Sequence, residues 1–215
     1  MRTAIFDLDG TLADTLADLA LSLNLTRAEF GFAPLTVREV AACVGEGARV
    51  MVARAVPDVP EAIDRLLSIQ RVHYRAHLLD NTVLYPGVKD TLDELKSAGW
   101  SLAVVTNKPS AVTFPILEGL GILSLFEAVV GGGDCPELKP DPAPLLLAAR
   151  RMGKTLDAED WIAGDHYTDL KAGRLAGIKR CFCRYGFGEA RGEAYDLAVD
   201  RLDGLPGALQ SQSVK

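Results

Sequence analysis

Two aspartates near the start of the chain, Asp7 and Asp9, stand two residues apart at the end of a short apolar run. In an extended segment both side chains can turn to the same side, while Leu8 between them faces the packing. Two carboxylates this close repel each other and raise the pKa of one of them, unless a cation lies between or beside them. The start of the chain is therefore typical of a site that holds a cation and uses carboxylates for chemistry.

Further polar residues follow later apolar runs, namely Thr106, Lys139, Asp165 and Asp169. If these runs are parallel strands, their carboxyl ends meet at one edge of a sheet, which is where open α/β proteins bind ligands. A cluster of carboxylates suits Mg²⁺, a hard cation that prefers oxygen ligands and keeps waters and phosphate oxygens around it. A lysine and a hydroxyl can bind phosphoryl oxygens while a carboxylate attacks, so the set indicates phosphoryl transfer.

Apolar runs alternate with helical patterns over most of the chain, which is typical of β-α-β units and a parallel sheet. The predicted strands are Thr3–Phe6, Ser101–Val105, Ala128–Val130, Trp161–Ala163 and Lys179–Arg184. The predicted helices beside them are Val88–Ala98, Ser110–Leu117 with Ser110 as its cap, Pro142–Met152 and a last one from Leu202 onward. We therefore expect the α/β fold class, with a Rossmann-like, doubly wound parallel sheet as the core and an inserted all-helical cap domain.

The region between the first two predicted strands shows only helical patterns and no obvious strand. Its helical stretches are Leu16–Leu23, a segment opened by the capping box Thr36–Glu39, Ala48–Val56 and Glu61–Leu79. A crossover between parallel strands needs only about a dozen residues or a little more, so four helices are better explained as a small separate domain. We place its joints near Thr11–Leu16 and Leu79–Pro86, which gives a catalytic core of residues 1–14 and 84–215 and a helical cap of residues 15–83.

The composition and charge indicate the class of protein and argue against some kinds of partner. Of the 215 residues, 48% are hydrophobic and 24% charged, which is typical of a globular chain with a sizeable core. A net charge of −6 without a basic run argues against nucleic acid or an anionic membrane as partner. No apolar run reaches the ~18 residues of a membrane span, and four scattered cysteines do not make a disulfide scaffold. We expect a cytoplasmic protein, a monomer or homodimer, that acts on a small phosphorylated metabolite.

Four motifs, taken together, carry a resemblance to a known family. They are Asp7-Leu8-Asp9-Gly10-Thr11, Thr106-Asn107-Lys108-Pro109, Lys139-Pro140 and Gly164-Asp165 through Asp169. In their order and spacing they resemble the four signature motifs of the haloacid dehalogenase-like phosphohydrolases, and the resemblance covers essentially the whole chain. The helical insertion after the first motif is similar to that of the subgroup whose cap lies between the first and second motifs.

A closer resemblance, to the phosphoglycolate phosphatases, rests on segments of both cap and core. These segments are Val44–Ala48 with Arg54-Ala55, Tyr85–Val88, Val105–Pro109, Val130–Gly132, Pro142–Leu147 and Tyr185–Glu189. The resemblance implies 2-phosphoglycolate as the substrate, a small phosphoester that carries its own carboxylate. A sugar phosphate or amino-sugar phosphate, which would need a roomier cap, stays an alternative substrate.

Carried over to this sequence, the family pattern implies a role for each core residue. Asp7 would be the nucleophile that forms an aspartyl-phosphate, and Asp9 the acid that protonates the leaving oxygen and the base that activates water. Thr106 would bind the phosphoryl group with the backbone around Asn107, while Lys139 would orient Asp7. The candidate Mg²⁺ residues are Asp7, Asp9 through its carbonyl, Asp165, and Asp169 as an ion-pairing neighbour rather than a direct ligand.

The cap and the rim supply the remaining candidate residues. By resemblance, a cap loop around Gly45 lies over the site, and we count Gly45, Gly10 and Asn107 among the substrate-binding residues. Arg49 is chosen by charge alone, because a substrate carboxylate needs a cationic or N–H-rich partner from the cap. His166 departs from the family, where a small serine is common, and we expect it at the rim or as a hydrogen-bond donor behind the residues that touch the ligand.

Other activities could use part of this set of residues. A phosphomutase of the same superfamily could use the same four motifs, and the core does not separate it from a phosphatase. A dehalogenase is disfavoured, because Asp9 supplies a proton that a phosphate ester's leaving group needs and a halide does not. A signalling receiver module also surrounds a phosphorylatable aspartate with acids, threonine and lysine. It has no use, however, for a residue placed to hydrolyse the phosphate or for a helical insertion.

Overall fold

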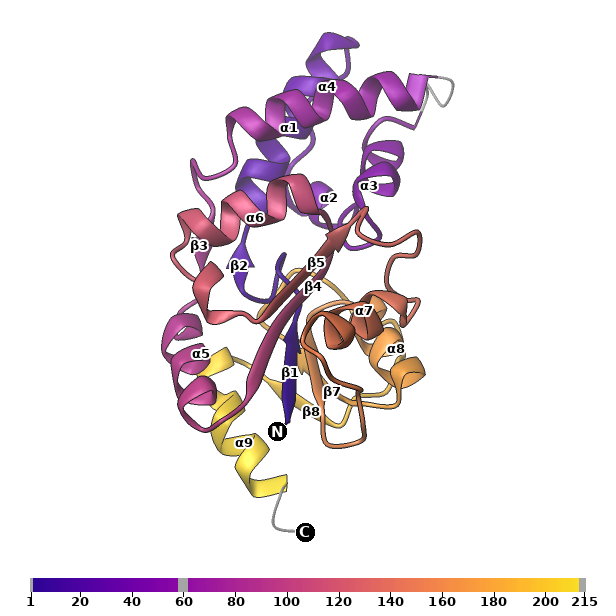
Figure 1. The fold of residues 1–215 in the computed structure, drawn as a ribbon. Helices are drawn as coiled ribbons and strands as arrows, with labels where there is room; N and C mark the ends of the chain where they lie inside the picture. Colours follow the sequence, from indigo (N-terminus) through magenta and orange to yellow (C-terminus); the bar gives the residue numbers. More distant parts are fainter. Residues whose placement is uncertain (1, 58–61, 213–215) are drawn as a thin grey trace.

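Six parallel strands form the central sheet of the computed structural model, which describes residues 2–57 and 62–212 (Figure 1). Their order across the sheet is β5-β4-β1-β6-β7-β8. The strands are β1 Thr3–Phe6, β4 Ser101–Pro109, β5 Ala128–Gly132, β6 Trp161–Gly164, β7 Lys179–Cys183 and β8 Leu197–Val199. The chain runs outward from β1 to one edge and then from β6 to the other, so the strand order reverses beside β1. Open α/β sheets bind ligands at such a reversal, beyond the carboxyl ends of the strands.

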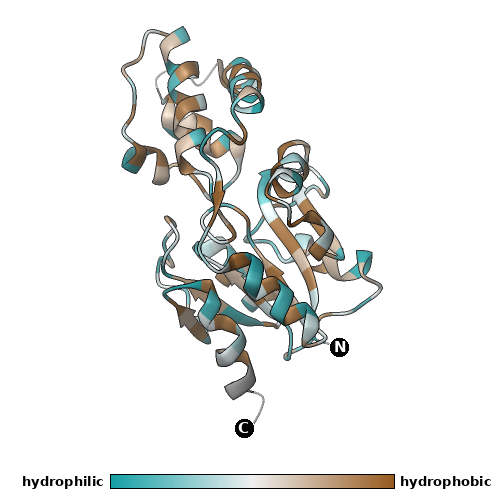
Figure 2. Cartoon of the chain, turned by 90° about the vertical axis from the view of Figure 1, so that its left-hand side faces the viewer, coloured by the Kyte–Doolittle hydropathy of each residue, from teal (hydrophilic) through white to brown (hydrophobic). Residues whose placement is uncertain are grey.

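Both faces of the sheet are buried under helices. Successive strand residues point to opposite faces, so Ala4 and Phe6 of β1 join one buried apolar cluster while Ile5 joins the other. The first cluster includes side chains of α5 Val88–Ser97, α6 Ser110–Gly119 and α9 Leu205–Gln212, and the second those of α7 Ala143–Arg151 and α8 Tyr167–Ala176. Figure 2 shows the hydrophobic strands inside and hydrophilic residues on the outer faces of the helices. The doubly wound α/β class is confirmed.

All five predicted strands are present in the sheet, although their ends differ. β4 continues four residues beyond the predicted Val105, and β7 ends at Cys183 instead of Arg184. The sixth strand, β8, has three residues, too few to show a period in the sequence. The prediction that Ser110 caps a helix was wrong: Pro109 precedes α6, and the Ser110 hydroxyl donates a hydrogen bond to Asp134 at 2.7 Å.

The helical patterns between the first two predicted strands form four helices, which we call the cap helices. They are α1 Leu16–Glu29, α2 Val37–Ala41, α3 Ala48–Ala55 and α4 Ile63–Ala76, with the predicted capping box present at the start of α2. Two short strands that the sequence did not predict, β2 Ala13–Asp14 and β3 Val83–Leu84, pair antiparallel where the chain enters and leaves the cap. This pairing supports our proposed boundaries, with residues 15–83 as the cap.

The cap helices share their packing with the sheet. Leu19, Val52 and Leu66 of the cap helices belong to the same buried apolar cluster as Phe6 of β1 and Leu92 of α5. This cluster continues from the cap helices into the core, and the division into a core and a cap of residues 15–83 stays a prediction. Burial of a side chain such as Leu66 contributes about 1.5–3 kcal/mol, and here it stabilises the position of the cap over the sheet edge as well as the cap itself.

A buried carboxylate, Asp18, joins the entry and exit of the cap. Asp18 lies in the first turn of α1, is fully buried, and accepts hydrogen bonds from the backbone N–H groups of Asn81 and Thr82 and from both of their side chains. Burial alone would raise the pKa of Asp18, but these hydrogen bonds outweigh it and lower the pKa below its usual value. The charged form of Asp18 therefore stabilises the folded state.

We expect Asp18→Asn to destabilise the protein by about 2–3 kcal/mol at neutral pH, since an amide keeps one acceptor oxygen and turns its NH₂ group toward donors. Because the folded-state pKa lies below the unfolded value of about 3.9, the wild-type advantage is complete above about pH 4 and is lost as the pH falls through the folded-state pKa. Urea unfolding of both proteins at several pH values measures this. Asp64→Asn, at an exposed carboxylate of α4, is the control, and an equal midpoint shift in both variants would contradict the role of Asp18.

Candidate active site

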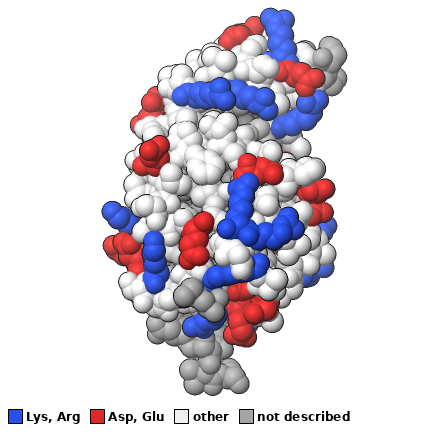
Figure 3. All heavy atoms as spheres, viewed as in Figure 1, with Lys and Arg blue, Asp and Glu red and all other residues white. Residues whose placement is uncertain are grey.

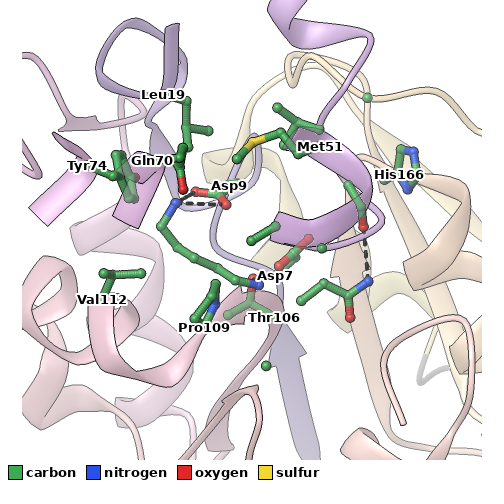
Figure 4. Close-up of a pocket in the computed structure, with 18 of the residues that line it drawn as sticks. Asp7, Asp9, Leu19, Met51, Gln70, Tyr74, Thr106, Pro109, Val112 and His166 are labelled. Atoms are coloured by element: carbon green, nitrogen blue, oxygen red, sulfur yellow. Dashed lines mark hydrogen bonds and ion pairs between the residues drawn. The ribbon is translucent and has the colours of Figure 1, made fainter. Parts of the chain in front are cut away.

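Three neighbouring strands bring polar side chains to one level at the carboxyl edge of the sheet. β1 pairs in register with both β4 and β6, so Asp7 after β1 lies close to Thr106 of β4 and Asp165 after β6. β4 is irregular between Val105 and Pro109, which places its polar residues over the edge instead of in the ladder. Figure 4 shows Asp7 beside Thr106, with Asp9 nearer the cap. The strand ends that the sequence predicts to meet therefore do meet.

Three buried carboxylates gather at this edge and form a candidate metal centre. One oxygen each of Asp7, Asp165 and Asp169 lie within 4.8 Å of one another. Burial raises the pKa of Asp7 to about 6 although Lys139 opposes it, and burial with the charges of Asp169 and Asp7 raises the pKa of Asp165 well above its usual value. Buried carboxylates with raised pKa values lack a sufficient counter-charge, which a divalent cation would supply.

Lys139 provides part of that counter-charge. Its ammonium donates hydrogen bonds to the Val105 carbonyl and to Asp169 Oδ1, both at 2.6 Å, and lies 3.2 Å from Asp7 Oδ1. Burial would lower the pKa of Lys139, but Asp169 and Asp7 outweigh it, so the lysine stays charged. Asp169 Oδ2 accepts from the His166 backbone N–H at 3.1 Å. Because both its oxygens already accept hydrogen bonds, Asp169 positions Lys139, as expected of an ion-pairing neighbour.

Asp9 is held by Lys108, a residue for which the sequence predicted no role. The Lys108 ammonium donates to both carboxylate oxygens of Asp9, at 2.9 and 3.0 Å, and the Thr15 hydroxyl donates to Oδ1 at 2.7 Å. Lys108 is buried, and the attraction of Asp9 raises its pKa although burial alone would lower it. Lys108 lies inside the second motif, but its partner lies 99 residues earlier in the chain and no local pattern connects the two.

Two of the predicted substrate-binding residues have structural partners instead. The Asn107 side chain donates to the carbonyls of Gly45 and Lys139 and accepts from the Lys139 N–H, so its amide joins the cap loop to the core. The Gly10 N–H donates to Ala13, and a side chain at Gly10 would collide with Asp165. That Gly10, Asn107 and the backbone around Asn107 bind substrate stays a prediction.

Gly45 lies where the cap loop passes closest to the core. Its φ of +112° is a conformation that side chains rarely adopt, and an added Cβ would lie 2.7 Å from the His166 ring. On the other side of the same loop, Glu46 pairs with Arg54 of α3 and with Arg191 of the core, at 2.7 and 3.1 Å. The predicted position of the loop over the site thus has a physical cause in a close approach and an ion pair between cap and core.

A cavity of about 300 Å³ lies between the cap helices and these carboxylates. Its core side is lined by Asp7, Asp9, Thr106, Asn107, Lys108, Pro109, Asp165 and His166, and its cap side by Val44, Gly45, Ala48, Met51, Gln70, Arg71, Tyr74 and Arg75, among others. His166, expected at the rim, lines this cavity. Its Nδ1 lies 2.9 Å from the Thr168 hydroxyl, and burial lowers its pKa to about 4, so the ring is neutral.

Arg49, chosen by its charge, does not line the cavity. On α3 the residues that face the cavity are Ala48 and Met51, and Arg49 is turned about 100° around the helix from Ala48. Its guanidinium pairs with Asp64 at 2.6 Å, and 60% of the side chain is exposed. The structure instead brings two arginines of α4, Arg71 and Arg75, to the cavity.

The motifs and this geometry agree with a family comparison. Residues 4–183 match the family model described as haloacid dehalogenase-like hydrolase. The chain belongs to this family. Among curated relatives of this hydrolase, a phosphoglycolate phosphatase of Agrobacterium fabrum is 41% identical over 189 residues, which cover 86% of this chain and 81% of the relative. A phosphoglycolate phosphatase of Pseudomonas putida is 36% identical over 215 residues, covering 95% and 78%.

Solved structures of similar proteins share the whole fold of this haloacid dehalogenase-like hydrolase. A predicted phosphoglycolate phosphatase from Haemophilus somnus superposes with a TM-score of 0.89 at 32% identity, over 97% of each chain. The structure of CbbY from Rhodobacter sphaeroides in complex with phosphate superposes with a TM-score of 0.80 at 25% identity, over 95% of this chain and 96% of the other. The resemblance inferred from the four motifs is confirmed.

Proposed function

We propose that this hydrolase is a Mg²⁺-dependent phosphatase that hydrolyses 2-phosphoglycolate through an aspartyl-phosphate intermediate. The observation that carries the proposal is the placement of Asp7, a buried carboxylate 3.2 Å from the Lys139 ammonium, on the same cavity as Asp9. A nucleophile and a second carboxylate that can move a proton, both facing one enclosed space, are what hydrolysis through a covalent intermediate needs. The names of the relatives above support the choice of substrate.

The residues on the cavity divide the reaction between them. An oxygen of Asp7 attacks phosphorus, the bond from phosphorus to the ester oxygen breaks, and Asp9 gives its proton to that leaving oxygen. Asp9 then takes a proton from a water molecule, which attacks the phosphorus of the aspartyl-phosphate and releases inorganic phosphate and Asp7. Thr106 and the backbone at Asn107 donate hydrogen bonds to phosphoryl oxygens, and Lys139 keeps Asp7 ionised and oriented.

The donor set fits Mg²⁺ by its chemistry and by its charge. The site comprises four aspartates and two lysines, Asp7, Asp9, Asp165, Asp169, Lys108 and Lys139. With every carboxylate ionised these groups leave two negative charges in excess, and one negative charge remains in excess when Asp9 carries the proton that it donates. In our proposal Asp7, Asp165 and the Asp9 carbonyl hold the cation. When bound, Mg²⁺ neutralises phosphoryl oxygens and lets the Asp7 carboxylate approach the anionic substrate.

A comparison of substrates tests the proposal. The wild-type protein with Mg²⁺ is assayed for release of inorganic phosphate from 2-phosphoglycolate, hexose phosphates and amino-sugar phosphates. We expect the highest kcat/KM for 2-phosphoglycolate, and an equal or higher value for a hexose phosphate would move the assignment to the alternative substrate class. Isomerisation of a sugar phosphate without release of phosphate would show a phosphomutase, and a stable phospho-Asp7 without turnover would show a receiver-like switch.

Asp9→Asn tests the proton-transfer role. The variant is expected to keep its metal affinity, since the proposed contact is through the carbonyl, and to lose about 10²–10⁴-fold in kcat. Steady-state kinetics and a Mg²⁺ titration measure the two effects. Asp14→Asn, an exposed aspartate of β2 outside the cavity, is the matched control. Loss of metal affinity in Asp9→Asn, or a kcat within a few-fold of wild type, would contradict this role.

The compartment in which the protein acts is also part of our proposal. All four cysteines are free thiols, and three of them are buried. Free thiols fit a reducing compartment, and we propose the cytoplasm. Within the residues that the structure describes, no helix is long and apolar enough to cross a membrane. A monomer or homodimer without nucleic acid partners stays a prediction from the sequence.

A further inference from the structure

One face of α4 forms part of the cap wall of the cavity. Four residues of this helix line it, namely Gln70, Arg71, Tyr74 and Arg75. Gln70 and Tyr74 are four residues apart, as are Arg71 and Arg75, so the members of each pair lie on the same side of the helix. In Figure 4 Gln70 and Tyr74 lie beside Asp9, on the side away from His166. A ligand whose phosphoryl group contacts Asp7 would therefore present its other end toward this helix face.

Two guanidinium groups on this face have no partner in the protein. Within residues 2–57 and 62–212, neither Arg71 nor Arg75 makes a hydrogen bond or an ion pair, and both side chains are exposed at the cavity. Two arginines of the neighbouring α3, Arg49 and Arg54, each pair with a carboxylate. Figure 3 shows basic and acidic side chains side by side on the helical upper part of the molecule. The cavity wall thus carries positive charge that no side chain of the described protein balances.

A buried hydroxyl beside these arginines also lacks a partner. Tyr74 is 4% exposed, and in the described part of the chain its Oη makes no hydrogen bond. The Lys108 ammonium lies over the face of the Tyr74 ring, 4.5 Å from its centroid, so its charge acts on the hydroxyl although the two groups make no hydrogen bond of ordinary geometry. Buried tyrosine hydroxyls almost always have a partner, and one that lines a cavity without a partner points to a group of the ligand.

The charges on the core side of the cavity are already assigned. Lys108 is paired with Asp9, and Lys139 with Asp169 and Asp7. The cations left for a further anionic group are therefore those of α4. Guanidinium groups bind carboxylates through two parallel N–H···O hydrogen bonds, which gives both strength and orientation.

We propose that Arg71 and Arg75, with the Tyr74 hydroxyl, form a subsite for a second anionic group of the substrate, a carboxylate on the carbon skeleton of the phosphoester. The inference rests on the proposed function, and it makes α4 the element that sets specificity. The subsite favours phosphoesters whose carboxylate carbon lies two or three bonds from the ester oxygen over neutral or cationic phosphoesters of the same size. The subsite acts on binding, because the carboxylate takes no part in the bond that breaks.

Kinetics with two substrates of one skeleton measure this preference. 2-Phosphoglycolate and ethyl phosphate share two carbons and differ in the carboxylate. In the double variant Arg71→Gln/Arg75→Gln we expect kcat/KM for 2-phosphoglycolate to fall about 10- to 100-fold, mainly through KM, and that for ethyl phosphate to change less than about 3-fold. Tyr74→Phe is expected to lower the first value about 3- to 10-fold. Arg49→Gln, on the same cap but outside the cavity, should change neither.

Binding measured without turnover separates this inference from the proposed function. In an Asp7→Asn background with Mg²⁺, calorimetric titration gives the Kd of each of the two ligands with and without the α4 substitutions. We expect 2-phosphoglycolate to bind more tightly than ethyl phosphate, and the double variant to remove the difference. If the wild-type protein hydrolyses no phosphoester, the proposed phosphatase activity is wrong. The Kd values would still test the subsite, because they do not depend on turnover. Equal Kd values for the two ligands, no binding of 2-phosphoglycolate, or an equal loss in Arg49→Gln would overturn the subsite.

Discussion

Asp7→Asn is expected to abolish turnover and covalent labelling together, with a loss on the order of 10⁴-fold or more in kcat. An amide oxygen is a poor nucleophile, and the substitution also removes the negative charge that faces Lys139 at 3.2 Å. Rapid quenching of the wild-type protein with ³²P-labelled substrate should trap an acid-stable, hydroxylamine-sensitive phosphoprotein, which the variant should not form.

The matched control for this variant is Asp14→Asn. Asp14 is exposed in β2, and its carboxylate accepts a hydrogen bond from the Leu16 N–H, outside the cavity. Its kcat should stay within about 2-fold of wild type, as for most surface substitutions. Turnover by Asp7→Asn near the wild-type rate, with the thermal stability of both variants unchanged, would disprove the covalent mechanism.

Removal of the divalent cation should lower the rate of hydrolysis about as much as Asp7→Asn does. With excess chelator we expect hydrolysis of both 2-phosphoglycolate and a generic aryl phosphate to vanish, and Mg²⁺ to restore it. The reason is the excess of negative charge among the buried carboxylates, since burial has raised the pKa of both Asp7 and Asp165. Without the cation, the anionic phosphoryl group would meet an uncompensated cluster of the same sign.

Calcium provides the discriminating measurement for the metal. Its larger and looser coordination shell would misplace the nucleophile relative to phosphorus, so Ca²⁺ should bind and inhibit. Activity is measured over a series of Ca²⁺ concentrations at fixed Mg²⁺. Full activity in excess chelator would contradict the metal assignment outright, and full activity with Ca²⁺ alone would contradict the geometric demand that we ascribe to Mg²⁺.

The two lysines of the site each pair with different aspartates. Each ammonium is buried and paired, Lys108 with Asp9 and Lys139 with Asp169 and Asp7. Removing one member of such a pair leaves an uncompensated buried charge, which costs about 3–5 kcal/mol. Substitutions at Asp9 or Asp169 should therefore be checked for folding before their activity is interpreted.

Local patterns in the chain were enough to predict the fold class and the strand ends that meet at the candidate site. Strand periodicity and polar residues after apolar runs are local patterns, and parallel pairing brings strand ends together whatever the loops between them do. Asp7, Thr106 and Asp165 therefore meet at one edge as expected. The capping box at Thr36 and the helices of the cap are equally local, because they depend on residues within a turn or two of each other.

The partners of long-range pairs and the directions of the cap side chains depend on how distant segments pack, and no local pattern predicts them. Lys108 pairs with Asp9 across 99 residues, and Asn107 joins Gly45 to Lys139, contacts that no local spacing encodes. Charge alone favoured Arg49, yet a turn of about 100° per residue takes it away from the cavity. Which arginines of an amphipathic cap face a cavity depends on how its helices pack on the sheet, and that packing is set by the shared apolar cluster rather than by any one helix.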